Sequence, residues 1–136
     1  MDYFVRRFRA VTVILPGLGV GVRSGKSYLL FESVDDPPPA QIQSAAWRIG
    51  WGGSQSADRT GPDGLLIETN TDTNFFNQVY LLSGDPVAAG EWYVNHLGAR
   101  PQGTTLAFDN VNLIILPTEG RLLPTRGRLI DHLAFS

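Results

Sequence analysis

The chain has 136 residues, 43% of them hydrophobic, and a formal net charge of -2 from 11 basic and 13 acidic side chains. This length suits one domain, residues 1–136, with a substantial core, and the balanced charge argues against nucleic-acid or anionic-membrane partners. The absence of cysteine excludes disulfides, zinc–thiolate sites and cysteine nucleophiles.

Basic residues precede an apolar run near the N-terminus, as they do in secretory signals. Arg6, Arg7 and Arg9 stand before "AVTVILPGLGVGV". Pro16 and three glycines interrupt the run, and no A-x-A-like cleavage site follows, so we expect a cytoplasmic protein. No stretch approaches the roughly 20 apolar residues of a membrane span.

Short apolar runs separated by turn residues predict a strand-rich chain. We expect loops at the glycine-rich "GLGVGVRSGKS", at "VDDPPPAQIQS", at "GGSQSADRTGPDG" and from Pro117 to Arg128. The expected strands are 9–15, "SYLLFES", "AWRIGW", "LLIET", "NQVYLLS", "TTLAF", "NVNLIIL" and "LIDHLAF".

One stretch predicts a helix, from about Asp85 to Leu97. Asp85 is a good N-cap, Pro86 suits the first helical position, and Gly98 suits the C-terminal stop. Apolar residues recur between them at helical spacing. The predicted class is therefore α+β, with a mainly antiparallel sheet and one principal helix.

Two familiar motifs fail on spacing or context. A phosphate-binding loop needs a glycine separated by four residues from Gly25, but Val20 stands there, just before "GVRSGKS". No helix is expected after Ser27, so the stretch indicates a hairpin turn. His96 lies near the C-terminus of the predicted helix, where an imidazole suits the helix dipole, and we interpret it as structural. No nucleophile has a base at a recognisable spacing.

The stretch "NQVYLLSGDPVAAGEWYVNHLGA" has a strand, a short loop with Asp85-Pro86, a helix and a Leu97-Gly98 stop. It resembles the opening of a module of the vicinal oxygen chelate superfamily, which contains the glyoxalases, extradiol dioxygenases and bleomycin resistance proteins. "GPDGLLIE" is similar to the close of such a module, and "RLIDHLAFS" to the opening of the next. The resemblance covers 61–136, and "AWRIGW" resembles a further, partial module within 1–60.

The resemblance implies strand-helix-strand-strand-strand units whose curved sheets pair around a divalent metal. It places candidate ligands at Gln78 and His132, on first strands, and at Glu68, on a last strand, with Arg48 where a histidine usually stands. Such ligands suit Zn, Ni, Mn, Fe or Co. Asn112 or Ile114 would face the position of the fourth metal ligand.

Each candidate also has an ordinary structural interpretation. The ring of His132 could have its hydrogen bonds satisfied in a core, or it could be exposed near the chain end. A lone histidine is weak evidence for a metal, since a metal needs several convergent ligands. Gln78 shares a face with Phe76 and Tyr80, so it could serve only as a hydrogen-bonding residue in a half-buried sheet. Glu68 could be a solvated charge at the end of a strand.

Two functions follow from the resemblance. One is a divalent-metal-dependent enzyme acting on a small oxygen-rich substrate, with the metal as Lewis acid and Glu68 as ligand or base. The alternative is a non-catalytic small-molecule-binding protein without metal, with an apolar pocket lined by aromatic residues. These residues are Trp47, Trp51, Tyr80, Trp92 and Tyr93. The partial modules and the unpaired last strand predict a homodimer.

Overall fold

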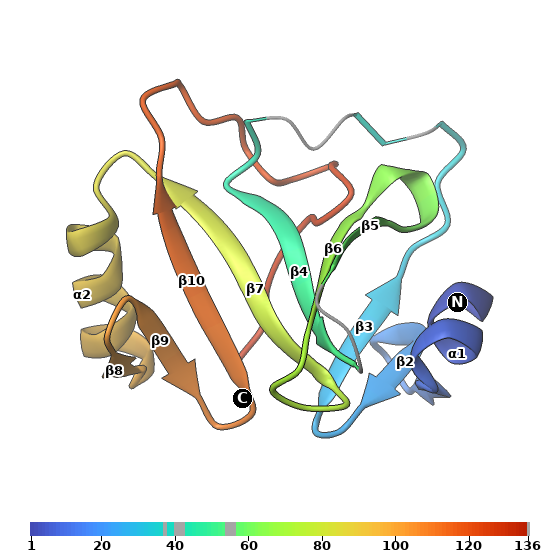
Figure 1. Cartoon of the computed structure of the whole chain (residues 1–136). Coiled ribbons are helices and arrows are strands. Elements are labelled where there is room, and N and C mark those ends of the chain that lie inside the picture. The colour runs from blue at the N-terminus through green and yellow to red at the C-terminus, as the bar shows by residue number, and fades with distance from the viewer. Residues whose placement is uncertain (37, 40–42, 54–56, 136) are drawn as a thin grey trace.

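The computed structural model describes residues 1–36, 38–39, 43–53 and 57–135 (Figure 1). The elements in chain order are α1 (Asp2–Phe8), β1 (Val11–Leu15), β2 (Gly19–Ser24), β3 (Ser27–Phe31), β4 (Ala46–Gly52), β5 (Ala57–Thr60), a 3-10 turn (Pro62–Gly64), β6 (Leu66–Asn70), β7 (Phe76–Ser83), α2 (Pro86–Leu97), β8 (Arg100–Gln102), β9 (Thr105–Phe108) and β10 (Val111–Pro117).

The strands of the described residues form two sheets. A twisted, mixed sheet has the order β5-β6-β4-β7-β10-β9-β8, and a smaller antiparallel sheet has the order β1-β2-β3 (Figure 1). Only the β7/β10 and β4/β6 pairs are parallel among these strands. The predicted α+β class, with a mainly antiparallel sheet and one principal helix, is confirmed.

The elements from β7 to β10 form one strand-helix-strand-strand-strand unit, whose sheet order is β7-β10-β9-β8. On the other side of β7, strands β4, β6 and β5 continue the sheet without a helix between them. The fold therefore has one complete unit of this type and a partial unit beside it, as the sequence predicted.

The principal helix, α2, begins and ends where the sequence predicted. The Asp85 carboxylate accepts a hydrogen bond from the Ala88 backbone N–H, at 3.0 Å. Gly98 adopts a left-handed conformation, with φ of 70°, which closes the last turn. Since α2 has no fully buried residue, its contact with the sheet is partial.

The helix α1 was not predicted, because the sequence predicted a strand from Arg9 and no element before it. Phe4 is fully buried and stacks on Trp51, at 5.6 Å between ring centroids. Phe8 stacks on the same indole at 4.7 Å. These aromatic contacts fix α1 between the two sheets, where the N-terminal residues contribute to the core.

The glycine-rich segment after Leu18 forms strand β2, not the connection that was predicted. A Cβ at Gly21 would lie 2.1 Å from the Leu29 carbonyl oxygen, so β2 and β3 approach more closely than any side chain would allow. Glycine at this position serves a close backbone contact within the sheet.

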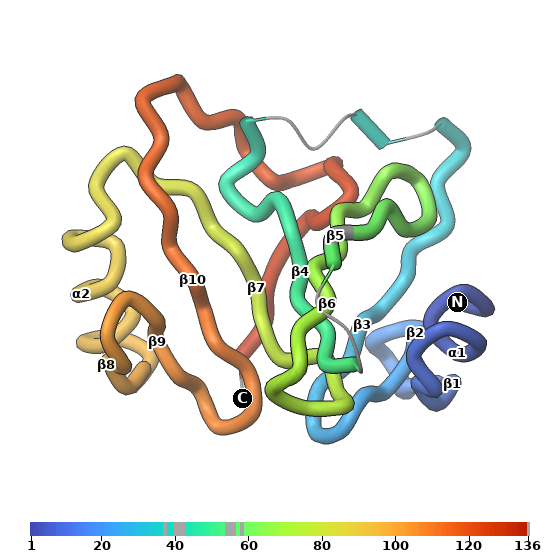
Figure 2. Tube along the Cα trace, viewed as in Figure 1, coloured from blue at the N-terminus to red at the C-terminus, as the bar shows by residue number. Residues whose placement is uncertain are grey.

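The predicted strand 129–135 is wrong, because these residues form no strand and follow an irregular path (Figure 2). Leu129, Ile130 and Leu133 still pack against the core, which explains the apolar alternation without a pairing strand.

Other predicted loops differ in part. Residues 57–60 form β5, where a loop was expected, and 100–102 form β8, for which no element was predicted. The predicted loop 34–44 includes residues 37 and 40–42, which lie outside the described residues, and 54–56 of the next predicted loop do so too. No helix in the described part of the chain is long and apolar enough to cross a membrane.

Candidate functional site

Two of the three predicted site residues lie on one face of the mixed sheet. Glu68 on β6 and Gln78 on β7 both pair in register with Gly50, on the strand between them. Strands are about 4.8 Å apart, so these two Cα atoms are about 10 Å apart. A Cβ at Gly50 would lie 2.5 Å from the Gln78 Cβ, so the glycine leaves room for that side chain.

Arg48 stands on the same face, two residues before Gly50. Its Nη2 lies 3.1 Å from the Glu68 Oε2, and the two side chains are 18% and 31% exposed. Its guanidinium also lies over the rings of Tyr80 and Trp47, at 4.1 and 4.7 Å from their centroids. A cation held by two aromatic faces and a carboxylate is well ordered.

Gln78 is buried in a network of neutral polar groups. Its Oε1 accepts hydrogen bonds from the Asn70 amide, at 3.1 Å, and from the Tyr80 hydroxyl, at 2.9 Å. Asn70 also exchanges hydrogen bonds with Asn77. The network satisfies the buried side chains and fixes the orientation of Gln78.

These residues do not fit a divalent metal. The Glu68 carboxylate already has a cation beside it, the Arg48 guanidinium. The Gln78 carbonyl, the other predicted donor on this face, already accepts two hydrogen bonds. No group of three or more His, Asp or Glu side chains gathers anywhere in the described residues. We therefore derive no chemical step through a metal.

His132 is separated from the other two predicted ligands. It lines a cleft together with Leu81 of β7, whereas Gln78, three residues earlier on that strand, points to the opposite face of the sheet. Its side chain is 79% exposed, and Nδ1 lies 3.0 Å from the Asp131 carboxylate. Within the described chain, the structure thus brings together Glu68 and Gln78 but not His132.

The cleft beside His132 lies between α2, the sheet and the C-terminal residues, and has a volume of about 480 Å³. Aromatic and aliphatic side chains line most of it, and Ser83, Thr125 and His132 add polar groups. The aromatic lining residues are Trp92, Tyr93 and Phe135. This volume lies within the range that small-molecule sites span.

Tyr93 and Phe135 connect the two sides of this cleft. Their ring centroids are 6.3 Å apart, and Phe135 also packs on Phe108 of β9, at 4.6 Å. Burial raises the pKa of the Tyr93 hydroxyl above its ordinary value. The irregular C-terminal residues thus form one wall of the cleft through aromatic contacts with α2.

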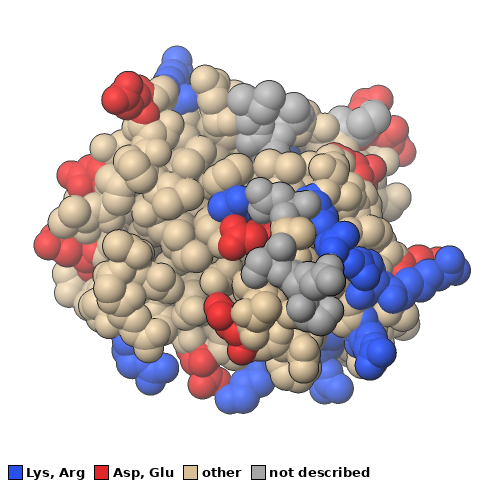
Figure 3. Space-filling view, viewed as in Figure 1, with Lys and Arg blue, Asp and Glu red and all other residues tan. Residues whose placement is uncertain are grey.

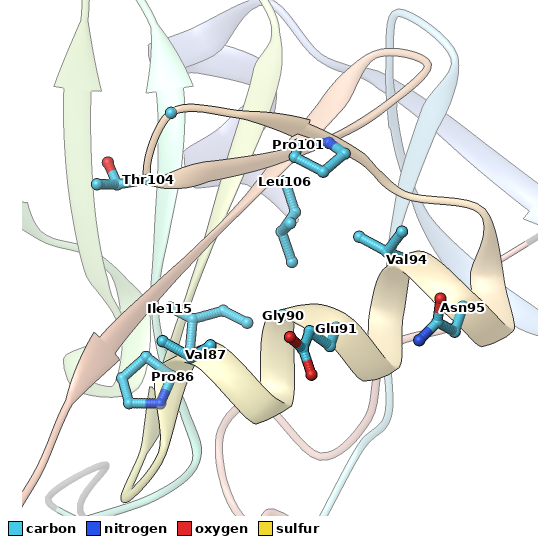
Figure 4. Close-up of a pocket in the computed structure, with 11 residues that line it drawn as sticks. Pro86, Val87, Gly90, Glu91, Val94, Asn95, Pro101, Thr104, Leu106 and Ile115 are labelled. Carbon is cyan, nitrogen blue, oxygen red and sulfur yellow. The ribbon is translucent and has the colours of Figure 1, made fainter.

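A second cleft, of about 470 Å³, lies on the other side of α2, below the β8–β9 hairpin (Figure 4). Figure 4 shows Leu106 and Val94 pointing toward its interior, with Glu91 and Asn95 along the helix. Ile115 lines both clefts. The helix α2 therefore forms a wall of both clefts.

The sequence identified Trp92 and Tyr93 as candidate pocket residues but missed Phe135, Leu133 and Ala89, which line the same cleft. Of the other predicted aromatic residues, Trp51 is fully buried in the core, and Trp47 and Tyr80 hold Arg48. A cleft formed by a helix and an irregular segment leaves no spacing pattern in the sequence.

On the face shown in Figure 3, an uncharged region lies to the left of the centre, and charged side chains lie at the rim, near the centre and to its right. No family model matches the sequence, and the comparisons with curated proteins and with solved structures found no match.

Proposed function

We propose that this chain is a small-molecule-binding protein that holds an apolar, ring-containing ligand between α2 and the C-terminal residues. The observation that carries the proposal is the 480 Å³ cleft lined by Trp92, Tyr93 and Phe135. Such a cleft is large enough for a drug-sized molecule, and its few polar groups would orient one polar end of the ligand.

The chemistry of the lining favours an aromatic ligand with one polar or anionic group. Rings stack on or meet the edges of Trp92 and Phe135, both of which retain exposed surface, 50% and 41%. His132 and Thr125 lie at the same cleft and could donate hydrogen bonds to a carboxylate or sulfonate.

The resemblance to the vicinal oxygen chelate superfamily remains part of the proposal. It is supported by the complete strand-helix-strand-strand-strand unit from β7 to β10 and by the partial unit next to it. Of the two functions that the resemblance implies, we favour the binding protein without metal, because Arg48 is paired with Glu68. A metal-dependent glyoxalase- or dioxygenase-like enzyme is the second candidate, and a metal titration tests it.

A cytoplasmic location also belongs to the proposal. It is supported by α1, in which Phe4 and Phe8 pack on Trp51, so that the N-terminal residues contribute to the core.

The proposal can be tested with a fluorescent aromatic sulfonate, 8-anilinonaphthalene-1-sulfonate, titrated into the folded protein. We expect saturable binding with blue-shifted emission, because the dye would leave water for an apolar cleft. Ala89→Phe should weaken binding at least tenfold, because the added ring would occupy the cleft from the helix side.

Gly90→Ala is the matched control. Gly90 is the next residue of α2 but lines the other cleft, where a Cβ has only the Leu106 side chain near it, at 3.9 Å. Wild-type affinity in Gly90→Ala and reduced affinity in Ala89→Phe, both folded by circular dichroism, would support the cleft. Equal affinity in all three proteins would refute the proposed site.

A further inference from the structure

The small sheet has one edge strand without the features that usually protect edges. Exposed strand edges offer unpaired N–H and C=O groups to other chains, and proteins protect them with charges, prolines, bulges or covering segments. Strand β1 has the sequence VTVIL, with no charge and no proline. It pairs only with β2 among the described strands.

Two of the other three edges of the described sheets carry charged or proline residues, and the third, that of β3, is covered only where the strand begins. Strand β5 contains Arg59, and β8 contains Arg100 and Pro101. The beginning of β3 is covered by the turn between β9 and β10, where the Lys26 ammonium pairs with the Asp109 carboxylate at 2.5 Å. The neighbouring Asn110 amide donates to the Ser27 hydroxyl at 2.5 Å.

The residues of β1 and its hairpin are unusually exposed for apolar side chains. Val11 is 53% exposed, Ile14 is 75% exposed, and Leu18 in the β1–β2 turn is 72% exposed. Ile14 aligns with Val20 and Phe31 across the sheet, so the exposed apolar surface continues beyond the edge strand. Contiguous apolar surface of this kind marks an interaction site.

We infer that β1 pairs with β1 of a second copy of this chain, in antiparallel orientation about a two-fold axis at Val13. This register places Val11 opposite the partner's Leu15 and Thr12 opposite the partner's Ile14. The exposed β-branched and aliphatic residues then meet each other across the two strands, as stabilising cross-strand pairs do.

The charges of the hairpin are compatible with this register. Arg9, the nearest charge in the chain, would lie opposite Gly17 of the partner subunit. The two copies of Arg9 are therefore displaced by eight residues along the strands, about 26 Å, which exceeds the Debye length of about 8 Å at physiological salt. The pairing thus keeps the two copies of Arg9 well apart.

The pairing also closes on itself. A two-fold axis through β1 uses the same edge of both copies, so β1 offers no free edge to a third copy. A five-residue strand pair with flanking hairpin residues buries on the order of 1,000 Å² in total, near the lower limit for specific interfaces. The expected product is a dimer that dissociates in the micromolar range.

The test is light scattering after size exclusion, with the full chain at about 100 μM, well above a micromolar dissociation constant. We expect about twice the 14.9 kDa chain mass for the wild type and the single chain mass for Ile14→Lys. The exposed Ile14 side chain allows lysine in the free chain, whereas the pairing would bury its charge beside the partner's Thr12.

Val87→Lys is the matched control, because Val87 is an apolar residue that is 72% exposed on α2, away from the small sheet. It should remain dimeric. Val11→Lys provides a second variant if Ile14→Lys fails to fold, and the backbone amides of 11–15 should exchange with solvent more slowly at high protein concentration. A monomeric wild type, or a dimer that Val87→Lys dissociates and both β1 variants leave intact, would overturn the inference.

Discussion

The guanidinium of Arg48 lies 3.1 Å from the carboxylate of Glu68, on adjacent strands that run parallel. The pair lies beside Gln78, across Gly50, where the resemblance to metal-binding modules had implied a divalent ion. A permanent cation on this face neutralises the one carboxylate that the ion would need. The geometry therefore disfavours a divalent ion at Glu68.

The Arg48→Ala variant should lose more stability than Glu68→Gln. Arg48 loses two aromatic contacts, worth about 1 kcal/mol each when partly desolvated, and a partly exposed ion pair worth at most about 1 kcal/mol. Glu68→Gln loses only the ion pair. Urea unfolding at neutral pH measures both changes. Equal losses for the two variants would show that Trp47 and Tyr80 do not stabilise the cation.

Divalent metals should leave the melting temperature of the wild-type protein unchanged. An ion that binds only the native state raises the melting temperature by mass action, and the described residues offer no fitting donor set. Differential scanning fluorimetry with Zn, Ni, Mn or Co measures this, with His132→Ala as a parallel sample. A saturable rise that Glu68→Gln abolishes would favour the metal-dependent enzyme.

The Asp85→Ala variant should destabilise the protein by about 1 kcal/mol, the usual loss for an N-cap. The Asp85 carboxylate accepts the Ala88 backbone N–H, which alanine leaves to water. Chemical unfolding measures the change, and Asp85→Ser, which keeps a capping oxygen, should retain most of the stability. If alanine and serine behave alike, the cap has no role in holding α2 beside the clefts.

Asp131 should contribute to the loss of stability in acid. The backbone N–H of Gly127 and the adjacent His132 ring hold the pKa of this carboxyl below its ordinary value of 3.8. A carboxyl with a lowered folded-state pKa adds stability above its unfolded value, and this stability disappears as the pH falls through the folded value. Between about pH 5 and about pH 2, the free energy of unfolding should therefore fall less in Asp131→Asn than in the wild type. Parallel acid curves would exclude this contribution.

The elements that could be predicted are those that nearby residues in the sequence specify. Asp85, Pro86 and Gly98 mark the ends of α2 through capping and backbone preferences that act within a few residues. Apolar runs bounded by turns identified β4, β6, β7, β9 and β10. Each of these elements is specified largely by its own residues.

The missed elements depend on distant contacts. Helix α1 is held by Trp51, more than 40 residues away, and β2 depends on the close approach of Gly21 to the Leu29 carbonyl. Conversely, the alternation around His132 predicted a strand, but Leu133 and its neighbours pack on the core without a pairing partner. Tertiary packing determined the secondary structure of these segments and overrode their local sequence preferences.

Of the three residues predicted to converge, Glu68 and Gln78 share a face of the sheet, whereas His132 lies at the cleft beside α2. The partner of Glu68 became visible only when the register placed Arg48 beside it and two rings against the guanidinium.

The most direct test of the proposed binding site is a two-dimensional NMR titration with the aromatic sulfonate. Our account predicts that backbone amide signals of Ala89, Tyr93 and Leu133, which line the cleft, shift saturably. The signals of Gly50 and Glu68, on the opposite face of the sheet, should remain in place. Saturable shifts at Gly50 and Glu68, with those of the cleft unchanged, would contradict it.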